Sequence, residues 1–72
     1  MKLPLFSGRE VVKVFEGLGW EIARQKGSHI ILVKEGHTAT LSVSDHKEVA
    51  KGTLRKLIAR AGITVQEFLE AI

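Results

Sequence analysis

The spacing of hydrophobic and polar residues predicts that the chain begins with a helix. Ser7-Gly8-Arg9-Glu10 matches a capping box, in which the Ser7 hydroxyl accepts from the amide of Glu10 and the Glu10 carboxylate reaches back. Gly19 is the expected left-handed residue after this helix. The hydrophobic residues in between recur at helical spacing and form one broad face: Val11, Val12, Val14, Phe15 and Leu18.

Three strands with short connections are expected next, at residues 20–25, 28–34 and 37–43. Lys26-Gly27 is typical of a turn between the first two strands, and Glu35-Gly36 of a two-residue hairpin between the last two. The third strand alternates between hydrophobic and polar residues, as a strand buried on one face does. The pattern predicts a three-stranded antiparallel meander.

The first two strands differ from the third in their pattern. In the first strand, Trp20 and Ile22 are expected on one face, with Glu21 and Gln25 on the other. The second strand contains the uninterrupted hydrophobic run 30–33, although a sheet covered on only one face should alternate. Either another segment of this chain or a partner protein is therefore expected to cover the second face of this strand.

Two more helices are expected after a polar, loop-like segment. The first opens at Gly52-Thr53 and ends at Gly62, and its buried stripe consists of Leu54, Leu57, Ile58 and Ala61. The second opens with the capping box Thr64-Val65-Gln66-Glu67 and repeats the stripe with Val65, Phe68, Leu69 and Ile72. Helices packed on one face of an antiparallel sheet make an α+β domain.

Length and composition limit the possible functions. With 72 residues the chain is expected to form a single domain, residues 1–72, with a small core. It has no cysteine, which excludes disulfides, cysteine-based zinc sites and thiol catalysis. The hydrophobic stretch near the N-terminus is too short for a signal peptide or a membrane span, so we expect a cytoplasmic protein without a membrane partner. A net charge of +3 permits nucleic-acid binding but does not establish it.

His29 is the main candidate for catalysis because of its surroundings. It stands at the start of the hydrophobic strand, directly after Gly27-Ser28, and Gly27 allows a phosphate to approach closely. The cations that flank it in sequence are Arg24, Lys26 and Lys34. Cleavage of an RNA phosphodiester without a metal requires a group that accepts the 2′-hydroxyl proton and cations that stabilise the phosphate oxygens. A histidine among cations fits that requirement, whereas most histidines are only polar surface residues.

The other polar residues support fewer possibilities. His46, in the loop after the third strand, could orient substrate or supply a second proton-transfer group, although loop histidines are usually only solvated. His37 is expected at the surface. The histidines come from separate elements without a neighbouring pair of carboxylates, so no metal and no cofactor are expected. Ser28 and His29 are adjacent on a strand and should point to opposite faces, which argues against a hydrolase triad with Asp45.

The second helix carries cations opposite its buried stripe. Lys51, Arg55 and Lys56 could face phosphates, because double-stranded RNA is recognised through its shape and backbone. A solvated helix face is the alternative explanation for the same residues.

Taken together, these residues resemble the HicA toxin family, the small mRNA interferases of bacterial HicA–HicB toxin–antitoxin pairs. The resemblance covers nearly the whole chain. It is carried by Gly19-Trp20, by the run from Arg24 to His29, by the polar segment that ends at His46, by Gly52-Thr53-Leu54-Arg55, by Ala61-Gly62-Ile63 and by Glu67-Phe68-Leu69. The Gly-Ser-His step and the Gly-Thr-Leu helix start are specific in combination, although neither is specific alone.

The resemblance implies a fold like that of double-stranded-RNA-binding domains, with a helix, three strands, a helix and here a short C-terminal helix. It also implies cleavage of mRNA with His29 as the catalytic residue, and a HicB-type antitoxin that binds the toxin and covers this histidine. One position departs from the family: Ser44 stands where a proline is common two residues before His46, which leaves the loop geometry and any role of His46 open. Without the Gly27-Ser28-His29 step, the same sequence would equally suit a non-catalytic RNA-binding module.

Overall fold

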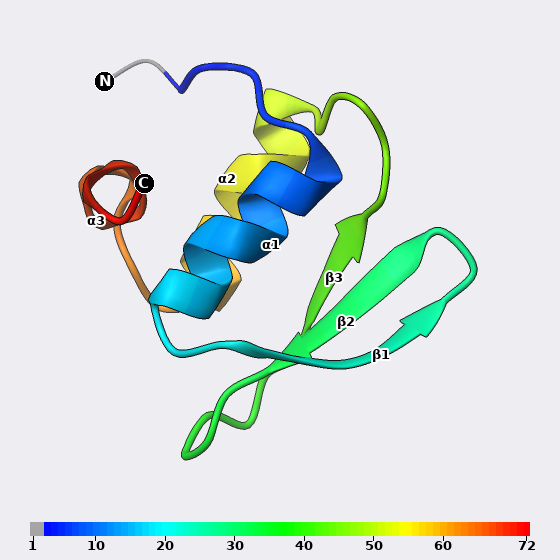
Figure 1. The fold of residues 1–72 in the computed structure, drawn as a ribbon. Helices are drawn as coiled ribbons and strands as arrows, with labels where there is room; N and C mark the ends of the chain where they lie inside the picture. The colour runs from blue at the N-terminus through cyan, green and yellow to red at the C-terminus, as the bar shows by residue number, and fades with distance from the viewer. Residues whose placement is uncertain (1–2) are drawn as a thin grey trace.

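The chain folds as an antiparallel sheet with its helices on one side. The computed structural model describes residues 3–72. The elements follow in the order α1 (Gly8–Gly17), β1 (Glu21–Lys26), β2 (His29–Val33), β3 (Leu41–Ser44), α2 (Lys51–Arg60) and α3 (Val65–Glu70). α1 and α2 both pack against β3, and α3 packs against α2 (Figure 1). This arrangement confirms the predicted α+β fold and matches the layout of a double-stranded-RNA-binding domain.

The predicted capping boxes of α1 and α3 are confirmed, whereas α2 begins at Lys51, one residue before the predicted start, and has no side-chain cap. The Ser7 hydroxyl accepts from the Glu10 amide at 3.1 Å, and the Glu10 carboxylate accepts from the Ser7 amide at 2.9 Å. Thr64 and Glu67 form the same reciprocal pair at the start of α3, with the same two distances. The left-handed residue expected after α1 is present, since Gly19 has a φ of 99°. Short-range sequence signals therefore fix the starts of α1 and α3 and the end of α1.

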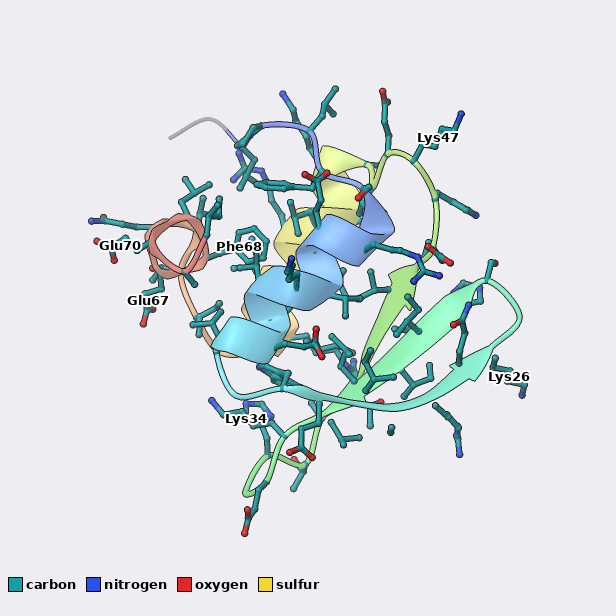
Figure 2. All side chains as sticks on the ribbon, in the orientation of Figure 1. Lys26, Lys34, Lys47, Glu67, Phe68 and Glu70 are labelled. Carbon is teal, nitrogen blue, oxygen red and sulfur yellow. The ribbon has the colours of Figure 1, made fainter. Side chains whose placement is uncertain are left out.

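The core lies between the sheet and the helices, and an aromatic cluster joins α3 to it. Phe68 is fully buried, with its ring 5.5 Å from that of Phe6 and 5.3 Å from that of Phe15, both in edge-on contact. Figure 2 shows Phe68 pointing from α3 toward α1, whereas Glu67 and Glu70 point outward. Among the residues expected on the α3 stripe, Ile72 departs from the prediction, because it lies beyond the last helical turn and is 70% exposed.

The sheet has the order β1-β2-β3, and its two faces are different. On the face that meets the helices, here called the inner face, β2 and β3 contribute four buried residues: Ile30, Leu32, Leu41 and Val43. On the opposite, outer face, Ile31 and Val33 are half-buried. Figure 1 shows the helices to one side of the sheet, so within the described chain no helix lies over the outer face. The second hydrophobic face of β2 therefore has no helix over it within residues 3–72, and its residues stay half-buried.

A bulge in β1 changes which of its residues share a face. The register with β2 shifts between Ile22 and Arg24. Ile22 and Gln25 both lie opposite buried β2 residues and both line a groove of about 220 Å³ against α1, so they share the inner face. The prediction that Gln25 lies on the same face as Glu21 is wrong, because the extra residue of a bulge reverses the alternation after it.

The beginning of β1 also differs from the prediction. Trp20 precedes the strand and is buried, with its ring 6.3 Å from that of Phe15, whereas Ile22 is half exposed. The two residues therefore do not form a common buried face. All six residues of β1 are exposed, as expected for a strand at the edge of a sheet.

β3 is shorter than the alternating pattern predicts. Residues 37–40 are not part of the strand, so the connection after β2 is a loop rather than a two-residue hairpin. His37 folds back, its ring centroid lies 5.1 Å from that of Trp20, and its Nδ1 is buried without a hydrogen-bond partner among the described residues. His37 was expected at the surface but is half-buried, because the aromatic contact holds one side of its ring against the domain.

Candidate active site

The outer face of the sheet brings His29 and two of the predicted cations together. In the register of the sheet, Lys26 and Ser44 lie on either side of His29, so the three residues form one row across the strands. Arg24, Ile31 and Ser42 form the next row in the same way. Residues paired across antiparallel strands point to the same face. Arg24 and Lys26, which flank His29 in the sequence, therefore share its face, and Arg24 does so because of the bulge that precedes it.

The imidazole of His29 is exposed and has one contact that orients it. Its Nδ1 lies 3.4 Å from the hydroxyl oxygen of Ser42 on β3. The ring therefore leans along the sheet toward the second row of residues rather than directly across to Ser44. The Nε2 atom, on the other side of the ring, has no hydrogen bond within residues 3–72, and His29 as a whole is exposed to solvent.

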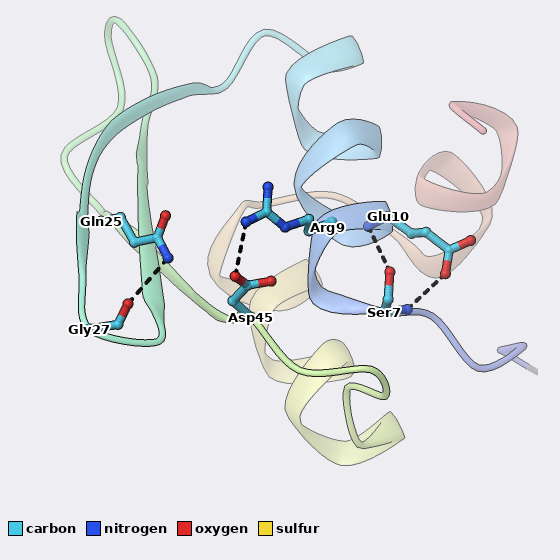
Figure 3. Close-up of polar contacts among 6 residues, drawn as sticks. All are labelled: Ser7, Arg9, Glu10, Gln25, Gly27 and Asp45. Carbon is cyan, nitrogen blue, oxygen red and sulfur yellow. Dashed lines mark hydrogen bonds and ion pairs between the residues drawn. The ribbon is translucent and has the colours of Figure 1, made fainter.

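The turn between β1 and β2 places Lys26 next to His29. Gly27 has a φ of 61°, which L-residues with a side chain rarely adopt, and nothing would lie within 4 Å of a Cβ at this position. The Gln25 side-chain amide donates to the Gly27 carbonyl at 3.2 Å and braces the turn (Figure 3). Figure 2 shows the Lys26 side chain pointing away from the body of the protein. The cation is therefore available to a ligand that approaches from solvent.

The loop after β3 is fastened to both sides of the site. The Asp45 amide donates to the Ser28 carbonyl at 2.6 Å, which joins this loop to the residue before His29. The carboxylate of Asp45 pairs with Arg9 of α1 at 3.2 Å (Figure 3). The loop that leads to His46 thus begins directly beside the start of β2. His46 itself is exposed, two residues beyond Ser44 in the row of His29.

The start of α1 closes this arrangement from the other side. The Gly8 amide donates to the His46 carbonyl at 2.9 Å. A Cβ on Gly8 would collide with the Ser44 carbonyl and would lie 3.0 Å from the Asp45 Cα. The glycine is required here by the close approach of two backbones, and its φ is not positive. The capping pattern Ser7-Gly8 did not reveal this role, because it depends on a contact between residues far apart in sequence.

The remaining cations of the sequence analysis lie elsewhere. Lys34 follows His29 by five residues, just after the end of β2. In an extended chain this separation places their Cα atoms about 17 Å apart. The Lys34 side chain lies near Gly19. The structure therefore does not bring Lys34 to the site. Lys51, Arg55 and Lys56 are exposed on α2, which packs against the inner face of the sheet rather than the face of His29.

The described residues contain no group of three histidine or acidic side chains that could hold a metal ion. No helix within residues 3–72 is long and apolar enough to cross a membrane. Ser42 was not among the site residues predicted from the sequence, although its contact with Nδ1 is the one hydrogen bond made by the imidazole within the described chain. The alternating pattern of the third strand predicts that Ser42 lies on the polar face of the sheet. It does not predict that His29 lies beside Ser42.

Comparison with known proteins agrees with the resemblance found in the sequence. The family model described as the HicA toxin of bacterial toxin–antitoxin systems matches residues 8–63. The match contains α1, the whole sheet and α2, and therefore every residue of the site described above. No curated protein and no solved structure matches the chain.

Proposed function

Because the chain belongs to the HicA toxin family, whose members are mRNA interferases of toxin–antitoxin systems, we propose that it is an endoribonuclease with His29 as its catalytic residue. The observation that carries this proposal is the position of His29 on the open outer face, in one row with Lys26 and with its Nε2 open to solvent. Family membership supports a toxin that acts on RNA. The assignment of individual residues is our own.

The chemistry proposed for this face is general acid–base catalysis without a metal. The Nε2 of His29 would accept the proton of the 2′-hydroxyl as that oxygen attacks the adjacent phosphorus. The bond between phosphorus and the 5′-oxygen of the next nucleotide breaks, the 5′-oxygen leaves as a hydroxyl with a proton from water, and a 2′,3′-cyclic phosphate remains. Arg24 and Lys26 would stabilise the negative charge that develops on the phosphate oxygens, since both lie on the same face as the imidazole. Ser28 and His46, which flank the row of His29, are proposed to contact the RNA backbone.

The cations away from the outer face are proposed to extend the RNA-binding surface. Lys51, Arg55 and Lys56 are exposed on one helix, and α2 carries no acidic residue. Contacts of lysine and arginine with phosphates make affinity depend on salt concentration. These residues would strengthen binding without taking part in the reaction, and Lys34 would contribute in the same way.

A HicB-type antitoxin is the partner proposed for the outer face. Ile31 lies between Arg24 and Ser42 on this face and Val33 lies beyond it, and both are only half-buried. A protein that covered these two residues would remove apolar surface from water and would also cover His29, two residues from Ile31. Inhibition and stabilisation of the toxin would then result from the same contact.

The test is cleavage of a long single-stranded RNA by the purified protein in EDTA. We expect the wild-type protein to cut the RNA and the His29→Ala variant to lose about 10²–10⁴ in rate, the usual effect of removing a general acid–base group. Because His29 is exposed, the variant should keep the far-ultraviolet circular dichroism and the melting temperature of the wild type. Addition of a HicB-type antitoxin should abolish cutting by the wild type.

A second exposed histidine provides the comparison. His46→Ala removes an imidazole from the neighbouring loop and should reduce cleavage far less than His29→Ala. Undiminished cleavage by folded His29→Ala would refute the proposed mechanism. If neither the wild type nor the variant cuts, but both retard RNA in a gel with a steep dependence on salt, the protein is a binding module instead.

A further inference from the structure

We propose that Ser42 is a positioning residue that holds the Nδ1 of His29 and thereby presents Nε2 to the RNA. The inference rests on the proposed catalytic role of His29. The observation behind it is the contact of 3.4 Å between the Ser42 hydroxyl oxygen and the Nδ1 atom. Ser42 itself would not touch the reacting atoms.

The sheet holds Ser42 rigidly at this place. Its neighbours on β3, Leu41 and Val43, are both fully buried on the inner face, so the backbone between them is fixed. Ser42 is paired with Ile31 and is therefore the diagonal neighbour of His29. Diagonal partners on one face of a sheet have Cα atoms about 7–8 Å apart, which a long ring such as imidazole can span.

The hydroxyl suits both protonation states that the proposed reaction requires. A serine hydroxyl can donate and accept, so it can accept from Nδ1–H in neutral and in protonated imidazole. When Nδ1 carries the proton, the lone pair of the neutral ring is on Nε2, the atom that is open to the substrate. The hydrogen bond made by one ring nitrogen determines which tautomer the other presents. The same contact therefore remains in place before and after Nε2 takes up a proton.

The residues beside His29 in its own row do not provide this contact. Lys26 can only donate hydrogen bonds, so it cannot accept from Nδ1–H. Ser44 has a hydroxyl, but it makes no hydrogen bond to the imidazole in the described structure. Without Ser42 the exposed ring would be free to rotate and to exchange tautomers. Small losses of orientation can lower a rate by as much as about 100-fold.

The test compares Ser42→Thr with Ser42→Val, two side chains of similar shape that both suit a strand. Threonine keeps the hydroxyl and valine replaces it with a methyl group. We expect Ser42→Thr to retain kcat within about threefold and Ser42→Val to lose about 10- to 100-fold in kcat with little change in KM. Thr38→Val, which removes an exposed hydroxyl from the loop after β2, is the control and should retain the wild-type rate.

A second measurement does not depend on catalysis. Nitrogen-15 NMR of the RNA-free protein reports which ring nitrogen of neutral His29 is protonated. The wild type and Ser42→Thr should show the Nδ1–H tautomer, and Ser42→Val should shift toward the Nε2–H tautomer that free histidine prefers. A general loss of stability would not shift the tautomer in this direction, so this measurement separates positioning from a structural role.

The outcomes distinguish this inference from the proposed function. If His29→Ala is inactive but Ser42→Val keeps both the wild-type rate and the wild-type tautomer, the role of Ser42 is wrong and the proposed function stands. If folded His29→Ala still cuts RNA, the proposed function is wrong, and the catalytic meaning of the contact with Ser42 is lost with it. Loss of kcat together with the tautomer shift in Ser42→Val, but not in Ser42→Thr, supports both.

Discussion

Gly8→Ala should destabilise this protein far more than an alanine at the start of a helix normally does. Alanine is the better helix former, and from local preference alone the change should be favourable. The structure predicts the opposite, because the added Cβ would collide with the Ser44 carbonyl and crowd the Asp45 Cα at 3.0 Å. Relief of the collision requires α1 to separate from the loop after β3.

The magnitude follows from two terms. Overpacking of this kind typically costs about 1–3 kcal/mol. Separation also breaks the hydrogen bond from the Gly8 amide to the His46 carbonyl, worth about 0.5–1.5 kcal/mol. The sum is about 1.5–4.5 kcal/mol, against a total free energy of unfolding of about 4–11 kcal/mol for a domain of 72 residues. At about 4–8 °C per kcal/mol for a domain of this size, the melting temperature should fall by roughly 6–36 °C.

The assay is thermal unfolding followed by circular dichroism, with Gly52→Ala as the matched control. Gly52 lies in α2, and a Cβ there would have nothing within 4 Å. The control should therefore keep the melting temperature of the wild type or raise it slightly. The higher helix preference of alanine should add about 0.5 kcal/mol to the free energy of unfolding. A melting temperature of Gly8→Ala within 2 °C of the wild type, roughly the error of the comparison, would show that the two backbones are not in close contact.

Two further changes test the core and the loop after β2. Phe68→Ala should cost about 3–5 kcal/mol, because it removes a fully buried ring that contacts two other aromatic rings, and urea unfolding monitored by the fluorescence of Trp20 would measure the loss. A change below 1 kcal/mol would contradict the position of α3. His37→Phe should stabilise the fold by about 1 kcal/mol in the same assay, because it keeps the aromatic contact with Trp20 and removes a buried nitrogen without a partner. Destabilisation by this change would indicate that the nitrogen is hydrogen-bonded in solution.

Helix boundaries could be predicted from the sequence because their causes are local. The Ser7–Glu10 and Thr64–Glu67 pairs are each made within four residues, and both are present as expected. The grouping of His29 with Lys26 was also predictable. The two residues flank a tight turn, and a tight turn places the residues on its two sides opposite each other. The buried residues of α1 and α2 could be predicted from the helical spacing of hydrophobic residues alone.

Apart from Ile72, which lies beyond the end of α3, the main errors concern features that local sequence does not determine. The bulge in β1 could not be read from a strand that is exposed along its whole length, because such a strand has no buried face to fix its alternation. His37 packs against Trp20, seventeen positions away in sequence, so its own neighbours gave no warning. The roles of Gly8 and Ser42 depend on which strand and loop lie opposite them, and an amphipathic pattern does not specify such pairings.

The bulge in β1 also bears on how the protein behaves in a concentrated solution. β1 is the edge strand beside β2, and an exposed edge with free backbone groups invites strands of other molecules to pair with it. Natural sheets discourage such pairing with charged side chains and with bulges that interrupt a regular edge. β1 has both, since the irregularity after Ile22 is followed by Arg24 and Lys26. The two cations proposed to bind phosphate would thus also discourage aggregation through the sheet edge when no RNA or partner protein is bound.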